Sequence, residues 1–175
     1  MLDIPTLETE HLLLRPYRLS DFDAYAAMWQ DEKVYRFIGG KSFTREQSWT
    51  RFLRQAGMWH YMGFGFWAIE DKATGVFGGE CGFHEVRREM TPPIEGTMES
   101  GWGLAPQLQS RGLAEEAMRA ALTWADENRP ADRLTAIIDP GHAASQRVAE
   151  KLGFVRIGTA DYGVPLVLFE RPHRS

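Results

Sequence analysis

The segment LAPQLQSRGLAEEAMRAALTWADE, residues 104–127, begins as a loop and continues as a helix. Its apolar side chains recur at helical spacing: Leu113, Ala117, Ala120, Ala121 and Trp124. This spacing predicts one buried helix face, on a helix that ends near Asn128-Arg129-Pro130. The loop before the helix, residues 109–114, combines a glycine with an arginine. Because an acidic cap alone would start the helix, these two residues require another explanation.

The loop residues favour binding of an anion. Free N–H groups and the dipole at a helix N-terminus attract negative charge. Gly112 has no Cβ to keep a bulky anion away from the backbone, and Arg111 adds a charged donor suited to phosphate. A diphosphate would fit this arrangement. The alternative is an ordinary helix start, at which Glu115 and Glu116 complement the dipole and would oppose an anion if they pointed toward it.

Outward from this loop, strand and helix patterns alternate within one domain, residues 1–175. Strands are predicted at residues 11–18, 65–70, 76–86, 97–104, 133–139, 154–161 and 164–172. Helices are predicted at residues 20–36, from residue 44 onward, at 113–128 and at 143–152, with Gly153 after the last. This order predicts a single-domain α/β fold with a mixed seven-stranded sheet and about four helices.

Two of the helix starts carry capping residues. Ser20 is a candidate N-cap for the first helix, and Thr44 with Gln47 matches a capping box for the second. In the second helix, four residues are expected to face the core: Trp49, Phe52, Leu53 and Ala56.

Composition excludes several classes of protein. The net charge of −4 provides no basic face for nucleic acid. The single cysteine, Cys81, excludes an intrachain disulfide and suits a reducing compartment. Since neither a signal peptide nor 18 consecutive apolar residues occurs, a cytoplasmic location without membrane contact is expected. The histidines lack the spacing of metal ligands, so no metal is expected and each is interpreted as a surface or structural residue: His11, His60, His84, His142 and His173.

Three motifs in order resemble one family. Gln109-x-x-Gly112-x-Ala114, between a strand and a helix, matches the Gln/Arg-x-x-Gly-x-Gly/Ala pattern of the GNAT superfamily of N-acetyltransferases. SQRVAEKLGF, residues 145–154, resembles the family's S-x-x-V-x-E-K-L-G-F block. LETEHLLLRP, residues 7–16, resembles the L-x-T-x-R-L-x-L-R-P opening of the branch that includes ribosomal-protein serine and alanine N-terminal acetyltransferases. The resemblance covers nearly the whole chain.

The resemblance implies an acetyl-CoA-dependent N-acetyltransferase whose sheet splays between its fourth and fifth strands. Backbone amides of the loop would hold the pyrophosphate of acetyl-CoA: Gln109, Ser110, Arg111, Gly112, Leu113 and Ala114. The pantetheine arm would lie like an added strand beside Trp102, Gly103 and Leu104. By their positions near the second motif, His142 and Ser145 would also contact the cosubstrate.

The implied reaction is direct attack of an amine on the thioester, so Cys81 is interpreted as a buried strand residue and not as a nucleophile. Glu99, just before the splay, is the candidate base, and its alternative is a solvent-facing strand residue. Ser145 is the candidate to assist the leaving thiolate, and its alternative is a helix-start residue. A lysine amine, with a pKa of about 10.4, costs roughly 3 kcal/mol more to neutralise at pH 7 than an α-amine at about 7.7–8.0. This difference favours a protein N-terminus or a small-molecule amine as acceptor.

Two departures from the family pattern keep a second hypothesis open. His142 stands where asparagine is common, and Ala149 stands where many members carry a tyrosine acid. The alternative is therefore a non-catalytic acyl-CoA-binding or sensing module on the same fold. Exposed strands near the C-terminus would also allow a homodimer. Aromatic residues of the first half could line an apolar acceptor slot, although a place in the core is the favoured interpretation for most of them: Trp29, Tyr35, Phe37, Trp59, Tyr61, Phe64 and Trp67.

Overall fold

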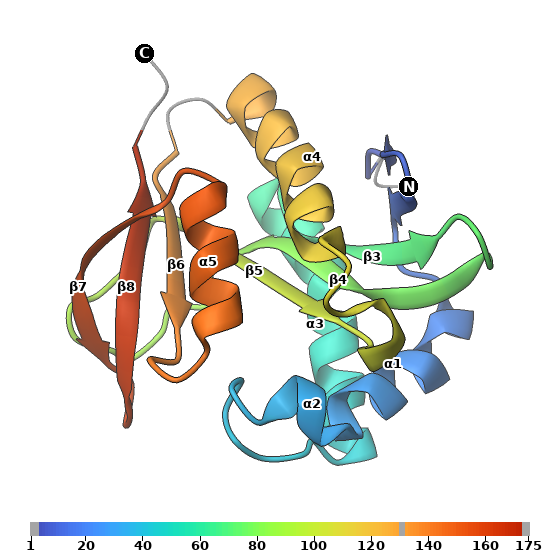
Figure 1. Ribbon diagram of the computed structural model, residues 1–175, viewed down its shortest axis with the longest axis horizontal. Coiled ribbons are helices and arrows are strands. Elements are labelled where there is room, and N and C mark those ends of the chain that lie inside the picture. The colour runs from blue at the N-terminus through green and yellow to red at the C-terminus, as the bar shows by residue number, and fades with distance from the viewer. Residues whose placement is uncertain (1–3, 130–131, 173–175) are drawn as a thin grey trace.

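The computed structural model of the chain describes residues 4–129 and 132–172 (Figure 1). Its centre is one eight-stranded sheet with the strand order β1-β2-β3-β4-β5-β6-β8-β7. The strands are β1 (Leu7–Glu8), β2 (Leu12–Arg15), β3 (Phe66–Asp71), β4 (Val76–His84), β5 (Met98–Leu104), β6 (Leu134–Ile138), β7 (Val155–Asp161) and β8 (Pro165–Arg171). Strands β5 and β6 are parallel, and the other neighbours are antiparallel. The predicted mixed α/β sheet in one domain is confirmed.

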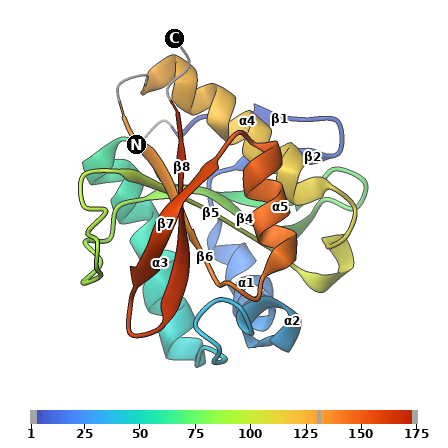
Figure 2. The same cartoon turned by 60° about the vertical axis from the view of Figure 1, so that its left-hand side comes forward.

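Helices cover both faces of the sheet. They are α1 (Phe22–Gln30), α2 (Glu32–Tyr35), α3 (Arg45–Met62), α4 (Leu113–Asn128) and α5 (Ala143–Lys151), with 3-10 turns η1 (Leu19–Asp21) and η2 (Pro106–Leu108). In both views α4 and α5 lie on one side of the sheet and α3 lies on the other (Figures 1 and 2). The main core joins Trp67, Phe83 and Met98 of the sheet to Ala117 and Ala121 of α4. Within the described ranges, every helix is too short or too polar to cross a bilayer.

The two parallel strands separate soon after they begin. β5 and β6 pair only at Met98–Leu134 and Glu99–Thr135, whereas β5 stays paired with β4 as far as Leu104. The expected splay between these strands is therefore present, closed at Glu99 and open toward the carboxyl ends. Because α4 follows β5 and α5 follows β6, the N-termini of both helices lie toward the open end.

The connection between β4 and β5, residues 85–97, is fastened to the C-terminal hairpin. Thr91 and Asp161 exchange two backbone hydrogen bonds of 3.0 and 2.8 Å. The same two segments share a small buried apolar cluster: Met90, Ile94, Ala160 and Leu168. These contacts hold the connection beside the closed end of the splay.

The first part of the chain differs from the prediction in two ways. The sheet has eight strands and not seven, because the two-residue β1 is too short to show a periodic pattern. The helix predicted at residues 20–36 is divided at Asp31, where the backbone is extended (φ −81°, ψ 127°). The Asp31 side chain accepts a hydrogen bond from the Lys33 amide and so caps α2. Helix α1 begins at Phe22, after η1, and not at Ser20.

The predicted inner face of α3 is largely wrong. Phe52 is buried, but Leu53 is 48% exposed and Trp49 is 38% exposed. Ala56 is also exposed. The buried face carries polar partners of a buried carboxylate: Arg51 and Gln55 both donate hydrogen bonds to Glu80, at 2.8 and 3.4 Å. Hydrophobic periodicity misplaces this face because part of what it buries is polar.

Candidate active site

Residues 109–114 form a turn between η2 and α4 that leaves backbone donors free. Ser110 and Gly112 both have left-handed backbone angles, with φ of 62° and 76°. No side chain caps α4, and the N–H groups of residues 110–114 find no acceptor anywhere in the described chain. A Cβ atom at Gly112 would meet no atom within 4 Å. The turn therefore offers unpaired donors and open space at a helix N-terminus, which is an anion site by its chemistry.

Gln109 and Arg111 have different tasks in this turn. The Gln109 side-chain amide donates a 2.9 Å hydrogen bond to the Leu104 carbonyl, which ties the turn to the end of β5. Arg111 is exposed and makes no ion pair with a described residue. Gln109 thus positions the turn, and Arg111 is available to an anion.

The acidic residues of the first turn of α4 have partners of their own. Glu115 pairs with Arg119 at 2.7 Å and with Lys151 of α5 at 3.2 Å. Glu116 accepts a 2.5 Å hydrogen bond from the Thr9 hydroxyl, in the β1–β2 connection. Both carboxylates hold α4 against its neighbours. Arg119 and Lys151 compensate the charge of Glu115, and Glu116 is hydrogen-bonded toward the β1–β2 connection.

Helix α5 brings two further predicted residues to the open end. His142 is its N-cap residue, and the His142 ring stacks on Phe37 with the centroids 4.5 Å apart. Burial lowers the pKa of His142, and nearby Asp139 acts in the opposite direction. Ser145, in the first turn of α5, has a hydroxyl without a hydrogen-bond partner among the residues described. The Glu115–Lys151 pair joins the first turn of α4 to the last turn of α5.

The predicted strand residues Trp102, Gly103 and Leu104 lie on β5 beyond its last pair with β6. This edge of β5 faces the splay without a strand partner in the described sheet. Sequence reasoning missed Ser100, at the start of the open edge, whose hydroxyl is buried and has no partner among described residues. The sequence offered no signal for it, because a lone serine in a strand carries no motif.

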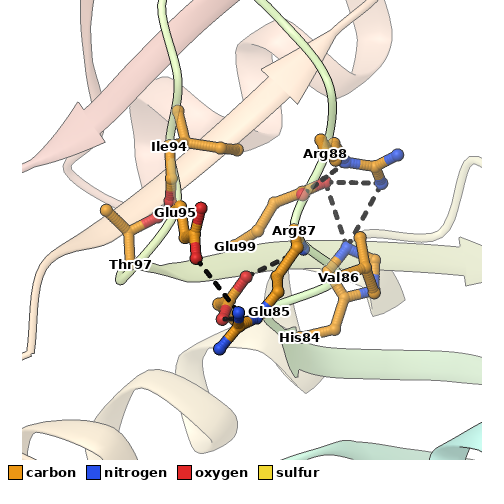
Figure 3. A pocket seen from close by; sticks show the side chains of 9 residues that line it. All are labelled: His84, Glu85, Val86, Arg87, Arg88, Ile94, Glu95, Thr97 and Glu99. Atoms are coloured by element: carbon orange, nitrogen blue, oxygen red, sulfur yellow. Dashed lines mark hydrogen bonds and ion pairs between the residues drawn. The ribbon is translucent and has the colours of Figure 1, made fainter.

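Glu99 lies at the closed end of the splay in a cluster of charged side chains (Figure 3). Arg88 donates to both carboxylate oxygens of Glu99, at 2.6 and 2.9 Å. The Nε2 atom of His84 lies 3.0 Å from Glu99 Oε1. Arg88 comes from the β4–β5 connection and stacks on Tyr162 at 5.1 Å. The cluster thus joins β4, β5, their connection and the C-terminal hairpin.

These contacts keep Glu99 negatively charged. Burial disfavours its charged form, but His84 and Arg88 outweigh burial and lower the pKa of Glu99 to about 2. The alternative of a solvent-facing residue is wrong, since Glu99 is 6% exposed. A carboxylate that accepts hydrogen bonds on both oxygens and has so low a pKa is a poor base. The geometry therefore does not favour Glu99 as the residue that takes the proton directly from the amine.

Sequence reasoning also missed His84, Arg88 and Tyr162. These residues come from a strand end, a loop and a hairpin turn, and no spacing rule links them. One signal was present: strands predicted at 76–86 and 97–104 could pair so that His84 stands opposite Glu99, as β4 and β5 do.

Other predictions for the site have mixed outcomes. Cys81 is completely buried, as expected, and burial raises the pKa of its thiol. Among the aromatic candidates for an acceptor slot, Trp59, Phe64 and Trp67 belong to the main core, which confirms the favoured interpretation, and Tyr61 is 82% exposed. Trp29 is buried, and the Arg51 guanidinium carbon lies 4.2 Å from the centroid of the Trp29 ring.

Comparison with known proteins gives the same result as the geometry. Residues 11–155 match the family described as the acetyltransferase (GNAT) domain. The uncharacterised protein YkkB of Bacillus subtilis strain 168 is 31% identical over 149 residues, covering 84% of this chain and 83% of YkkB. An acetyltransferase from Agrobacterium tumefaciens C58 superposes with a TM-score of 0.84 at 28% identity, covering 98% of this chain and 96% of that one.

A more distant structure shares the fold alone. It is RimL, a ribosomal L7/L12 alpha-N-protein acetyltransferase solved with coenzyme A, with a TM-score of 0.74 at 16% identity. The superposition covers 95% of this chain and 97% of RimL. The splayed sheet, the open turn before α4 and these matches lead to one conclusion. The chain belongs to the GNAT acetyltransferase family and is an acetyl-CoA-dependent acyltransferase.

Proposed function

We propose that the protein transfers the acetyl group of acetyl-CoA to a primary amine, either a protein N-terminus or a small molecule. The observation that carries this proposal is the turn at residues 109–114, with its free N–H groups and open space at Gly112. RimL, which shares the fold, was solved with coenzyme A. A pyrophosphate matches these donors in charge and number, so the residues present fit the cosubstrate.

The binding residues follow the splay from its open end inward. The amides of residues 109–114 and the Arg111 guanidinium hold the pyrophosphate. The open edge at Trp102, Gly103 and Leu104 binds the pantetheine arm as an added strand. His142 and Ser145 approach from the start of α5. Acetyl-CoA supplies an activated thioester, so the chain needs no nucleophile of its own.

The chain's own catalytic task is the handling of protons. Glu99 provides the negative charge that compensates the proton released by the amine, from its buried position at the closed end. Ser145, whose hydroxyl has no partner among the described residues, assists protonation of the departing thiolate. A backbone N–H near Leu104 stabilises the oxyanion, a contribution worth about 3 kcal/mol in other acyl-transfer sites.

The acceptor is an amine that is readily neutral near pH 7. An α-amine has a pKa of about 7.7–8.0 and is neutral in roughly a tenth of molecules at pH 7. This favours a peptide N-terminus or an amino compound of similar pKa over a lysine side chain. A cytoplasmic location remains a prediction.

A homodimer is also part of the proposal. Strand β7 is an edge of the sheet, and Val155 and Ile157 on it are 49% and 51% exposed. Pairing of two β7 edges would cover these side chains. Light scattering at several protein concentrations tests this, and a monomer at every concentration would contradict it.

Turnover of an amine panel tests the proposed function. Release of free CoA thiol is followed with acetyl-CoA and peptides that begin with Ser or Ala, polyamines, amino acids and aminoglycosides. We expect at least one α-amine to raise thiol release well above hydrolysis without amine. CoA binding without turnover of any amine would contradict transfer and support the acyl-CoA-binding module instead.

A further inference from the structure

His84 has one ring nitrogen that the fold leaves without a partner. The residue is 5% exposed, and its Nδ1 atom is buried with no hydrogen-bond partner among described residues. Its other nitrogen, Nε2, lies 3.0 Å from Glu99 Oε1. A buried polar atom left unpaired costs about 1–3 kcal/mol. Native structures tolerate few such atoms, and each requires an explanation.

The neighbours of His84 determine which nitrogen carries the proton. Glu99 is a charged carboxylate and therefore accepts hydrogen bonds only. Arg88 Nη2 also approaches Nε2, at 3.4 Å, but the contact with Glu99 is shorter at 3.0 Å and favours a proton on Nε2. In the neutral ring, Nδ1 then carries a lone pair that accepts a hydrogen bond from none of the described residues. This is the arrangement of a base held in one tautomer by a carboxylate.

The charges around the ring keep it neutral until a proton arrives. Burial lowers the pKa of His84, Glu99 raises it, and Arg88 and Arg51 lower it again. Glu99 faces the ring from β5, Arg88 from the β4–β5 connection and Arg51 from α3. The Phe66 ring of β3 packs at 5.1 Å between ring centroids. His84 is thus a neutral imidazole near pH 7, beside a carboxylate that stabilises the imidazolium once formed.

We propose that His84 is the general base of the acetyl transfer and that Glu99 is its positioning residue. The inference rests on the proposed function. The amine nitrogen forms a bond to the thioester carbonyl carbon, and its proton passes, through one water, to the Nδ1 lone pair of His84. The C–S bond then breaks, the thiolate takes a proton from solvent with the assistance of the Ser145 hydroxyl, and imidazolium returns its proton to solvent. The products are the acetamide and CoA thiol, with no oxidation or reduction.

The strand geometry places this base on the β4 side of β5, at the closed end of the splay. His84 stands opposite Glu99 in the β4–β5 ladder, and Gly82 and Gly101 form another pair of the same ladder. A Cβ at Gly101 would approach the Phe66 ring within 2.7 Å. The Phe66 ring therefore lies over Gly101 and also packs against the His84 ring.

His84→Gln tests the base while keeping the contact to Glu99, since the glutamine amide can still donate from near the Nε2 position. For an α-amine that the wild type acetylates, we expect kcat/KM at pH 7 to fall by about 10²-fold or more. In the wild type, kcat/KM divided by the fraction of neutral amine should still fall at low pH, because His84 becomes protonated. In His84→Gln this fall should be absent. CoA affinity and thermal stability should stay near wild type, and exposed His60→Gln serves as the matched control.

Three outcomes separate the possibilities. Wild-type turnover that is unchanged in His84→Gln, with an unchanged pH profile, would overturn the base and leave the proposed function intact. Absence of turnover by the wild type would overturn the proposed function and the base with it. If His84→Gln does not fold, the ring nitrogen signals in long-range ¹H–¹⁵N spectra of the wild type decide. The neutral Nε2–H form at pH 7 supports the base, and a cation or an Nδ1–H form overturns it.

Discussion

Glu99 shows how a single buried charge depends on its partners. A carboxylate withdrawn from water is costly unless its oxygens are paired. Here Arg88 engages both oxygens and His84 approaches one of them. The two partners therefore determine both the charge of Glu99 and the stability that it contributes.

The pH dependence of unfolding tests this charge. The pKa of Glu99 falls from its ordinary value of 4.5 to about 2 on folding, so its contribution is present above pH 5 and is lost as pH falls toward 2. The shift corresponds to roughly 3 kcal/mol at neutral pH. The lowered pKa of His84 acts in the same direction, because the unfolded chain takes up that proton first as pH falls.

Glu99→Gln should therefore be less stable than wild type by about 3 kcal/mol at pH 7, with a difference that shrinks toward pH 2. Urea unfolding of both proteins between pH 7 and pH 2 measures this. A difference that is constant across the range would contradict the assigned pKa.

Residue roles could be predicted from the sequence only where they are local. Gly112 and Arg111 stand in one short loop, and their positions before a helix already indicated an anion site. Tyr162 is far from His84 and Arg88 in the chain, and it meets Arg88 because the β4–β5 connection docks on the C-terminal hairpin. The charge and the burial of Glu99 follow from that docking. The sequence alone therefore could not show whether Glu99 can act as a direct base.

At the scale of elements, one ion cluster joins the start of the chain to the sheet. Arg15 of β2 donates two 2.8 Å hydrogen bonds to Asp21 of η1 and one of 2.6 Å to Glu70 of β3. The side chains of Arg15 and Asp21 are 4% and 6% exposed. The arginine of the LRP motif near the N-terminus is thus structural: it fixes where α1 begins.

Arg15→Ala should lower the free energy of unfolding by about 3–5 kcal/mol, because it leaves Asp21 buried without its partner. Arg133→Ala is the matched control. Arg133 pairs with Glu170 at 2.5 Å but is 56% exposed, so its loss should cost less than about 1 kcal/mol. Denaturant unfolding compares the two variants, and equal losses would contradict the structural role of Arg15.

Element positions were well predicted where apolar periodicity was strong and poorly where it was not. The long helix α4 and the buried strand β6 match their predicted ranges closely. Helix α3 buries polar groups around Glu80, so its inner face could not be read from apolar spacing. The division at Asp31 depends on one capping interaction, which sequence alone does not distinguish from an ordinary helical aspartate.

At the scale of the whole molecule, topology creates the site. One parallel pair in an otherwise antiparallel sheet places two helix N-termini at the same end, and early separation of the pair opens a strand edge between them. Composition and periodicity predicted the strand order along the chain but not which strands are neighbours. The splay was expected from the family resemblance, because separation of two strands leaves no local pattern in sequence.

The central claim is that backbone donors around Gly112 bind the pyrophosphate, and titration calorimetry with CoA tests it most directly. Gly112→Asp and Gly112→Asn are close in shape, and both residue types tolerate a positive φ better than most. They differ in charge. We predict that the Asn variant binds CoA within a few-fold of wild type and that the Asp variant binds at least tenfold more weakly, about 1.4 kcal/mol. Equal CoA affinity of the wild type and both variants would contradict the claim.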